Sequence, residues 1–374
     1  MRRPVSPGTH RRTDAPSRTL LPAAVLALLV LLLAPSPAGA ARLPQAPRSF
    51  FGVVMDGPML SPSAPVEREL RLMHRDGLGF VRVPVHWVDL QPAPGATDLR
   101  PVDRIVRAAA HAGLNVLPVV VRSPSWAASG PDLGSPPRDL TTYQAFLRTL
   151  VGRYGPRGTL WDELPRADRR PLRLWQVWSE PNLKWFWSAE PWAERYVALL
   201  RAGRAALKSA DPGARIMLAG LPNQSSQALE QLYEAGGRGL FDEAAIHPYT
   251  RKVANMIRLV KRGRRVMDRN GDRAVPLALT EFGWTSGQGR ATLNLGWETT
   301  ERGQATKLRE ALTSLAEHRR ELGLRHVAWY TWLSPRLGPS DSFAYSGLRR
   351  QTGRGTVSKP ALRTLRTTLR RLTR

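Results

Sequence analysis

The stretch Arg173-Leu-Trp-Gln-Val-Trp-Ser-Glu-Pro-Asn182 is an apolar, β-prone run that ends in a glutamate and a proline. Similar runs recur along the chain, and longer helix-prone stretches separate them. The predicted strands are residues 50–55, 80–85, 114–122, 172–178, 215–219, 244–249, 276–282 and 326–332. Helical stretches between them include residues 101–112, 143–154, 191–210 and 301–322. This alternation predicts a parallel sheet covered by helices.

Eight such units within residues 41–348 predict an α/β fold, a single (β/α)8 TIM barrel. An open, doubly wound sheet is the alternative. No glycine-rich phosphate loop follows the first predicted strand and no Gly-Lys pair occurs, so the nucleotide-binding form of that fold loses support. Pro101, Asp139 and Pro191 are typical of helix starts, and Gly113 and Gly323 of helix ends.

The first forty residues differ in composition from the rest of the chain. Several arginines precede an apolar run from Leu20 to Ala34, and Ala38-Gly-Ala40 follows. These parts are typical of a secretory signal peptide over residues 1–40 with cleavage after Ala40, which predicts a secreted or cell-wall-associated protein. An uncleaved membrane anchor is the alternative, although the run rises only ~22 Å as a helix against a hydrocarbon core of ~30 Å.

The chain has a formal net charge of +26 and no cysteine, which excludes disulfides and thiolate chemistry. Residues 251–273 and the C-terminal segment 349–374, which includes the last predicted helix, are rich in lysine and arginine. Such surfaces bind nucleic acid, anionic lipid or an acidic cell-wall polymer, or are simply solvated. Neither segment contains a stacking aromatic residue, so no nucleic-acid partner is predicted, and an anionic wall polymer stays a candidate for the basic segment.

Two glutamates stand at the ends of predicted strands. Glu180 ends the fourth strand, and Glu281 ends the seventh in Pro276-Leu-Ala-Leu-Thr-Glu281. In a (β/α)8 barrel the carboxyl ends of the strands meet at the catalytic face. Hydrolysis of a glycosidic bond with retention needs a carboxylic acid and a carboxylate about 5–5.5 Å apart. The pattern predicts such a site, and charged strand ends without a catalytic role are the alternative.

The run Trp175-Gln-Val-Trp-Ser-Glu-Pro-Asn-Leu183 resembles the W-x-x-W-N-E-P-N-L motif of clan A glycoside hydrolases, most like family 39 with features of family 5. Other stretches similar to motifs of that group are Arg82-Val-Pro-Val-His-Trp87, His247-Pro-Tyr249, Thr280-Glu-Phe-Gly-Trp284 and Trp332. Family 39 includes β-xylosidases, α-iduronidases and exopolysaccharide glycosidases. The resemblance implies Glu180 as acid/base, Glu281 as nucleophile, a poly- or oligosaccharide substrate and no cofactor.

The resemblance also implies supporting roles at the same face. Arg82 is expected to hydrogen-bond Glu281 and keep it ionised, Tyr249 to orient Glu281 through its hydroxyl, and His247 to lie beside them. A surface arginine and a satisfied core histidine are the alternatives. No metal site is predicted, because the seven histidines are scattered without an HExxH pattern.

Three tryptophans are candidates for stacking on a sugar ring. They are Trp332 at the end of the eighth predicted strand, Trp126 and Trp187. Their alternative role is packing in the core. The resemblance further places a non-proline cis peptide bond directly after Trp332.

Ser179 departs from the family pattern, which has asparagine directly before the acid/base. That amide meets the substrate's 2-hydroxyl, whereas a serine hydroxyl is shorter and has one donor where an amide has two. A catalytically weak or inert carbohydrate-binding barrel at the cell surface is therefore the alternative function. In either case we expect a monomer.

Overall fold

The computed structural model describes residues 44–222, 224–336 and 341–373. The predicted signal peptide at residues 1–40 lies outside these ranges. Within them, no helix is both long enough and apolar enough to cross a membrane.

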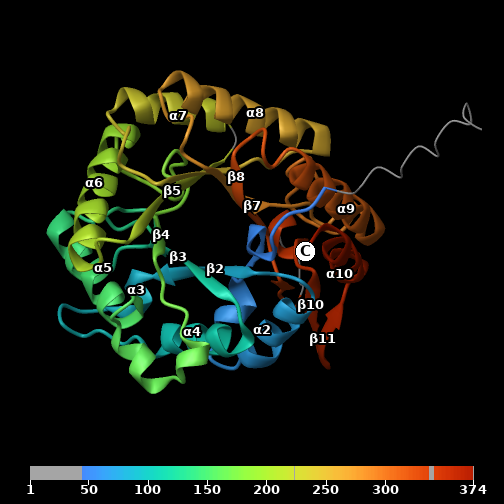
Figure 1. The fold of residues 1–374 in the computed structure, drawn as a ribbon, viewed down its shortest axis with the longest axis horizontal. Helices are drawn as coiled ribbons and strands as arrows, with labels where there is room; N and C mark the ends of the chain where they lie inside the picture. Colours follow the sequence, from blue (N-terminus) through green and yellow to red (C-terminus); the bar gives the residue numbers. More distant parts are fainter. Residues whose placement is uncertain (1–43, 223, 337–340, 374) are drawn as a thin grey trace, which may run out of the picture. The chain divides into compact units, whose positions relative to one another are not determined.

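A closed barrel of parallel strands forms the centre of the fold (Figure 1). Neighbouring strands follow the chain order, and the first pairs with the eighth to close the ring. The strands are β1 (Phe51–Val54), β2 (Phe80–His86), β3 (Asn115–Val121), β4 (Leu174–Val177), β5 (Arg215–Pro222), β6 (Glu243–His247), β7 (Leu277–Phe282) and β8 (Leu324–Trp329). The prediction of a (β/α)8 barrel is confirmed.

Helices follow the strands and surround the barrel (Figure 1). They are α2 (Val66–Arg75), α3 (Trp87–Leu90), α4 (Arg100–Ala112), α5 (Leu140–Tyr154), α6 (Trp192–Ala210), α7 (Ser225–Glu234), α8 (Val253–Arg269), α9 (Glu301–Glu317) and α10 (Pro360–Leu372). Short 3-10 helices are η1 (Arg48–Phe50), η2 (Gly57–Leu60), η3 (Thr159–Glu163), η4 (Arg166–Asp168) and η5 (Ser342–Tyr345). Apolar side chains between strands and helices form the main core.

The C-terminal segment completes the ring of helices. β10 (Arg349–Thr352) pairs with β9 (Leu333–Ser334) and β11 (Gly355–Ser358), and α10 then packs against α9. Arg366 of α10 pairs with Asp76 at the end of α2, with 2.8 Å between Nε and Oδ1. Residues 349–373 therefore belong to the same compact unit as the barrel.

The barrel interior has an apolar layer followed by a polar one. The apolar layer consists of Val54, Phe80, Leu117, Leu174, Met217, Ala245, Ala278 and Ala328. Side chains along a strand alternate between its two faces, so residues two positions further on also face the interior. On six of the strands these next residues are polar or aromatic: Asp56, Arg82, Gln176, His247, Thr280 and Tyr330. The polar layer lies toward the carboxyl ends of the strands, where barrel enzymes hold their active sites.

Candidate active site

Glu180 reaches the mouth of the barrel through an unusual backbone turn. Directly after β4, both Trp178 and Glu180 adopt left-handed conformations, with φ of 67° and 51°. Residues other than glycine adopt this conformation at a cost in free energy, and they cluster at functional sites. A hydrogen bond of 3.0 Å from the Glu180 backbone N–H to the Gly220 carbonyl holds the turn.

Glu281 is directed into the barrel by an irregularity in β7. The pairing of β7 with β8 shifts register between Leu279 and Phe282. Such bulges change the direction in which side chains point. Thr280 and Glu281 are consecutive, yet both contact residues across the barrel: Thr280 contacts Gln176, and Glu281 contacts Arg82.

The two glutamates lie close together. One oxygen of Glu180, one oxygen of Glu281 and one nitrogen of His247 are all within 4.8 Å of one another. Carboxyl groups of retaining glycosidases are about 5–5.5 Å apart, and those of inverting enzymes about 6.5–9.5 Å. The spacing therefore suits direct attack by one carboxylate rather than activation of a water molecule between two.

Glu281 is held as a carboxylate. Arg82 donates to its Oε1 from Nη1 at 2.7 Å, and the Tyr249 hydroxyl donates to its Oε2 at 2.8 Å. Burial opposes the charged form, but the positive charges of His247 and Arg82 and these two hydrogen bonds outweigh it and hold the pKa of Glu281 below its ordinary value. An ionised carboxylate at this position can act as a nucleophile.

Glu180 has the opposite electrostatic environment. Its side chain is almost completely buried, and burial raises the pKa of Glu180 above its ordinary value, although its hydrogen bond with His247 and the charge on that histidine oppose the rise. A raised pKa keeps a carboxylic acid protonated near neutral pH. The two carboxyl groups thus have pKa values pushed apart, as an acid and a nucleophile require.

His247 connects Glu180 to the polar layer. Its Nδ1 lies 2.7 Å from Oε1 of Glu180, and its Nε2 lies 2.9 Å from the Thr280 hydroxyl. Gly220 makes room for the ring, because a Cβ at that position would lie 1.9 Å from Nε2. The imidazole is fully buried and has a defined orientation.

A hydrogen-bonded chain runs from one carboxylate to the other. Arg82 donates from Nε to Gln176 Oε1 at 2.7 Å, and Gln176 donates to the Thr280 hydroxyl at 3.2 Å. The Thr280 hydroxyl also lies 2.9 Å from His247 Nε2, and His247 Nδ1 lies 2.7 Å from Glu180 Oε1, which completes the chain. Gln176 and Thr280, which the motifs did not identify as site residues, thereby orient both carboxylates.

Ser179 faces the same region. Its hydroxyl accepts a hydrogen bond from Arg82 Nη2 at 3.2 Å and keeps its own proton for another acceptor. Ser179 lines both hollows described below. At the position of the family asparagine, this chain therefore has a short hydroxyl side chain that already accepts a hydrogen bond from Arg82.

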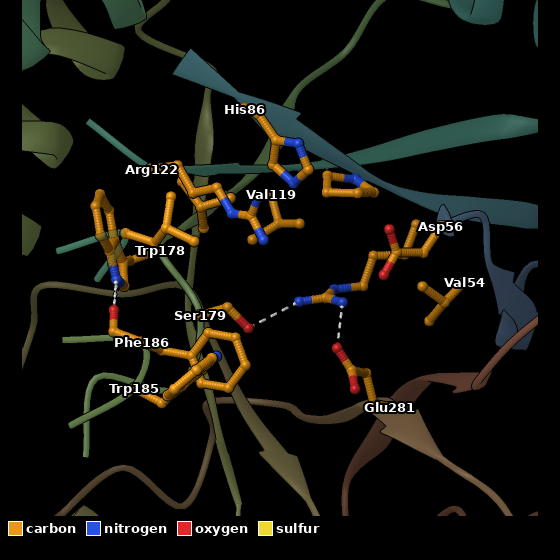
Figure 2. A pocket seen from close by; sticks show the side chains of 14 residues that line it. Val54, Asp56, His86, Val119, Arg122, Trp178, Ser179, Trp185, Phe186 and Glu281 are labelled. Carbon is orange, nitrogen blue, oxygen red and sulfur yellow. Dashed lines mark hydrogen bonds and ion pairs between the residues drawn. The ribbon is translucent and has the colours of Figure 1, made fainter. Parts of the chain in front are cut away.

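Two adjoining hollows open over the glutamates. The larger, of about 750 Å³, contains Glu180, Glu281 and Tyr249, with an aromatic wall that includes Trp297 and Phe343. The smaller, of about 140 Å³, is lined by residues that include Asp56, His86, Arg122, Ser179 and Glu281 (Figure 2). Asp56, Arg122 and Tyr330 were not among the predicted site residues. Asp56 and Tyr330 follow the apolar layer by two positions, which is the signal that could have found them.

The predicted stacking role of Trp332 is wrong. β8 ends at Trp329, three residues earlier than expected, and the Trp332 side chain is fully buried. Its indole N–H donates to Glu69 of α2 at 2.8 Å, so the ring points away from the mouth. Tyr330 lines the larger hollow instead, and the non-proline cis bond joins Tyr330 to Thr331 rather than following Trp332.

The other two tryptophans also lie away from the hollows. Trp187 is only 2% exposed and packs edge-on against Trp178 and Tyr196, which rules out stacking on a sugar. Trp126 is half-buried, packs against Trp87 and donates to the Gln91 carbonyl. Trp185 and Phe186, which are exposed at the rim of the smaller hollow, are the aromatic residues available there.

Glu180, His247 and Glu281 also have the composition of a metal site, and in the described part of the chain they are the one such group that lies close enough. Both Glu281 oxygens already accept hydrogen bonds, one of them from the Arg82 cation. A divalent cation would be repelled by that guanidinium. The electrostatics suit acid and nucleophile roles better than metal binding.

Neither a protein-family model nor a curated protein sequence matches the chain. Solved structures with the same fold include a family 39 glycoside hydrolase from the gut symbiont Bacteroides cellulosilyticus WH2, at 20% identity and a TM-score of 0.67 over 86% of this chain and 63% of that one. The family 39 enzyme from Xanthomonas axonopodis pv. citri matches at 16% identity and a TM-score of 0.63, over 88% of this chain and 71% of that one. A family 5 glycoside hydrolase from Bifidobacterium longum matches at 16% identity and a TM-score of 0.60, over 86% of this chain and 78% of that one.

These likenesses define the class of fold. The chain has a (β/α)8 barrel, the fold of these glycoside hydrolases and the fold that the resemblance of its motifs implied. The match with the Bacteroides cellulosilyticus enzyme covers 63% of that enzyme's length, which is less than two thirds. The reaction of this particular chain is argued below from its own residues.

Proposed function

We propose that the protein is a retaining glycoside hydrolase in which Glu180 is the acid/base and Glu281 the nucleophile. The main support is the pair of carboxyl groups, which lie within 4.8 Å of each other and have pKa values shifted in opposite directions. That combination is what double displacement at a sugar requires.

In the first step, a Glu281 oxygen attacks the anomeric carbon while Glu180 gives its proton to the leaving oxygen. This forms a glycosyl ester on Glu281 and leaves Glu180 as a carboxylate. In the second step, Glu180 takes a proton from water, the water oxygen bonds to the anomeric carbon, and the Glu281 carboxylate is released. Arg82 and Tyr249 hold Glu281 in place throughout, through the hydrogen bonds of 2.7 and 2.8 Å.

The test is hydrolysis of a broad panel of aryl glycosides and polysaccharides, with product stereochemistry followed by NMR. Glu281→Gln should lose at least about 10³-fold in kcat while the protein stays folded. Glu194→Gln, which makes the same change on the exposed face of α6, should keep wild-type activity. Normal turnover by Glu281→Gln, or inverted product, would refute the assignment.

Ser179 supports a second candidate function, a carbohydrate-binding barrel with weak or no catalysis. The family asparagine has two amide donors, whereas the Ser179 hydroxyl has one donor and already accepts from Arg82. Ser179→Asn should raise kcat on aryl glycosides if the serine has lowered activity. A wild type that binds oligosaccharides without cleaving any, and that stays inactive as Ser179→Asn, would favour the binding function.

We further propose that the protein is exported and acts on a poly- or oligosaccharide outside the cell. The basis is the residue pattern at positions 1–40, with cleavage after Ala40. Sequencing the amino terminus of the protein recovered from the medium or cell wall should give Ala41. Recovery of the uncleaved chain from membranes would point to the anchor alternative.

Attachment to an anionic wall polymer stays a proposal, and the structure narrows the residues that could perform it. Arg349 and Lys359 are buried, and Arg366 is paired with Asp76. Within residues 349–373, the exposed basic residues are Arg354, Arg363, Arg370 and Arg371. Replacing these four by glutamine should weaken salt-sensitive binding to cell walls, and unchanged binding would argue against this role.

A further inference from the structure

The two hollows differ in which carboxyl group they contain. Glu180 lines the larger one, whereas Glu281 lies at the boundary of both. The leaving oxygen must meet Glu180, so under the proposed function the leaving group occupies the larger hollow and the sugar attacked by Glu281 extends into the smaller one. The smaller hollow has a volume of about 140 Å³. A water molecule needs roughly 10–15 Å³ of cavity volume, so this hollow holds about ten non-hydrogen atoms, the size of one sugar ring.

The smaller hollow contains an arginine that the catalytic machinery does not use. Each of the three guanidinium nitrogens of Arg82 already donates, to Gln176, Glu281 and Ser179 respectively. Arg122 lines the same hollow, yet within residues 44–222, 224–336 and 341–373 its guanidinium has no hydrogen-bond or ion-pair partner. A half-buried guanidinium without a partner is available for a ligand.

The backbone holds Arg122 in this position. It is the first residue after β3 and has a φ of 62°, in the left-handed region that non-glycine residues seldom adopt. Its carbonyl accepts a hydrogen bond of 3.0 Å from the Val88 N–H of α3. Conformations of this kind recur where a side chain must be aimed at a ligand.

The surrounding charges would orient an anion toward Arg122. Figure 2 shows Arg122 and His86 on one side of the hollow and Asp56 on the other. Asp56 accepts from the Gly57 N–H at 2.7 Å and from the Tyr330 hydroxyl at 3.4 Å. An Asp56 carboxylate attracts sugar hydroxyls and repels a second carboxylate, so a negatively charged substituent is favoured only at the Arg122 end.

We propose that the smaller hollow binds a sugar that carries a carboxylate, a hexuronic acid residue, and that Arg122 forms the ion pair with it. The inference rests on the proposed function for which end of the substrate lies in the smaller hollow. The charge preference of the hollow does not depend on the proposed function. A planar guanidinium binds a carboxylate through two parallel hydrogen bonds, which no neutral hydroxymethyl group can match. His86, which is half-buried and lines the same hollow, has its Nδ1 3.2 Å from Asp89 and adds a ring nitrogen to the same wall.

Two measurements test the proposal. The first compares kcat/KM for p-nitrophenyl hexuronides with that for the matching neutral hexosides, in both anomeric series. The wild type should prefer the hexuronide, and Arg122→Gln should lower the ratio of the two kcat/KM values by about 10- to 100-fold, with Arg122→Lys in between. Both substrates have the same neutral aryl leaving group, so Arg251 in the larger hollow should affect both kcat/KM values equally.

The second measurement is binding of free glucuronate, galacturonate, glucose and glucose 6-sulfate by NMR, which needs no turnover. Arg195→Gln is the matched control, because it removes the same charge from an exposed position on α6. It should leave the ratio and the binding unchanged, whereas non-specific attraction by the +26 chain would respond to both substitutions alike.

The outcomes separate this proposal from the proposed function. Uronate binding that Arg122→Gln abolishes, in a protein that cleaves nothing, supports the inference and refutes the hydrolase. Cleavage of neutral hexosides with no uronate preference, or a preference that survives in Arg122→Gln, overturns the inference and leaves the hydrolase standing. Binding of glucose 6-sulfate without binding of either uronate would overturn the assignment of a carboxylate.

Discussion

Gly220→Ala is expected to disable the acid/base without touching either carboxylate. A Cβ at this position would lie 1.9 Å from Nε2 of His247 and 2.4 and 2.5 Å from two ring carbons. Carbon atoms in contact are about 3.5 Å apart, so the imidazole must move by roughly 1.5 Å. That movement breaks the hydrogen bonds of His247 to Glu180, at 2.7 Å, and to Thr280, at 2.9 Å.

The expected cost follows from those two bonds. A hydrogen bond to a charged group contributes about 1.5–3 kcal/mol and a neutral one about 0.5–1.5 kcal/mol, so Gly220→Ala should lower the free energy of unfolding by roughly 2–4 kcal/mol. Misplacement of a catalytic group by about 1 Å lowers turnover by about 100-fold. His247 lowers the pKa of Glu180, so its displacement should move the alkaline limb of the pH–rate profile to higher pH.

The assay is denaturant unfolding together with the pH dependence of kcat/KM. Gly152→Ala is the control, because an added Cβ in this helical position meets nothing within 4 Å and should stabilise the protein by about 0.5–1 kcal/mol. A Gly220→Ala protein with wild-type stability and an unshifted alkaline limb would refute the role given to Gly220 and His247.

Four further substitutions test other parts of the structure. Arg82→Gln removes a charge that lowers the pKa of Glu281, so the acidic limb of the pH–rate profile should move to higher pH; a fall in kcat with that limb unmoved would contradict the role of Arg82. Lys359 is buried, and burial lowers its pKa to about 7, so the folded state binds fewer protons than the unfolded state between pH 7 and 10.5 and stability rises across that range. Lys359→Met should therefore stabilise the protein by roughly 5 kcal/mol below pH 7, less the contribution of the hydrogen bond to the Tyr345 carbonyl, and by little above pH 10. A gain in the free energy of unfolding that does not depend on pH would show that burial of the charge is not the cause. Trp332→Phe should cost about 1–2 kcal/mol through the lost hydrogen bond to Glu69 and leave KM within about 2-fold, whereas Tyr330→Ala should raise KM; the reverse pattern would restore Trp332 as a sugar platform.

The barrel and the position of the two glutamates were accessible from local patterns. Strand and helix periodicities are properties of consecutive residues. Gly113 ends α4 in a left-handed conformation, and the Asp139 side chain caps the start of α5, as these residue types predict. The period of two also extends the prediction. Counting two residues on from the apolar layer reaches Asp56 and Tyr330, which the motifs did not identify.

The tryptophans show where local patterns fail. Trp332 was expected at the end of a strand, but β8 stops at Trp329 and the chain then crosses to bond with β1 through the Trp332 N–H and the Val54 carbonyl. That contact joins residues far apart in the sequence. Tryptophans of the core and of a sugar site have the same local surroundings, so only the packing of distant elements separates them.

The amino-acid sequence by itself determined that this chain alternates strands and helices, closes with eight strands, and carries glutamates after the fourth strand and in the seventh. Periodicity and capping are local, and the sequence therefore contains them directly. The tertiary structure alone decided how the side chains meet: the left-handed turn at Trp178 and Glu180, the register shift in β7, and the position of Arg122 in the smaller hollow. These features depend on pairing between strands distant along the chain, and that pairing sets the surroundings of each carboxyl group.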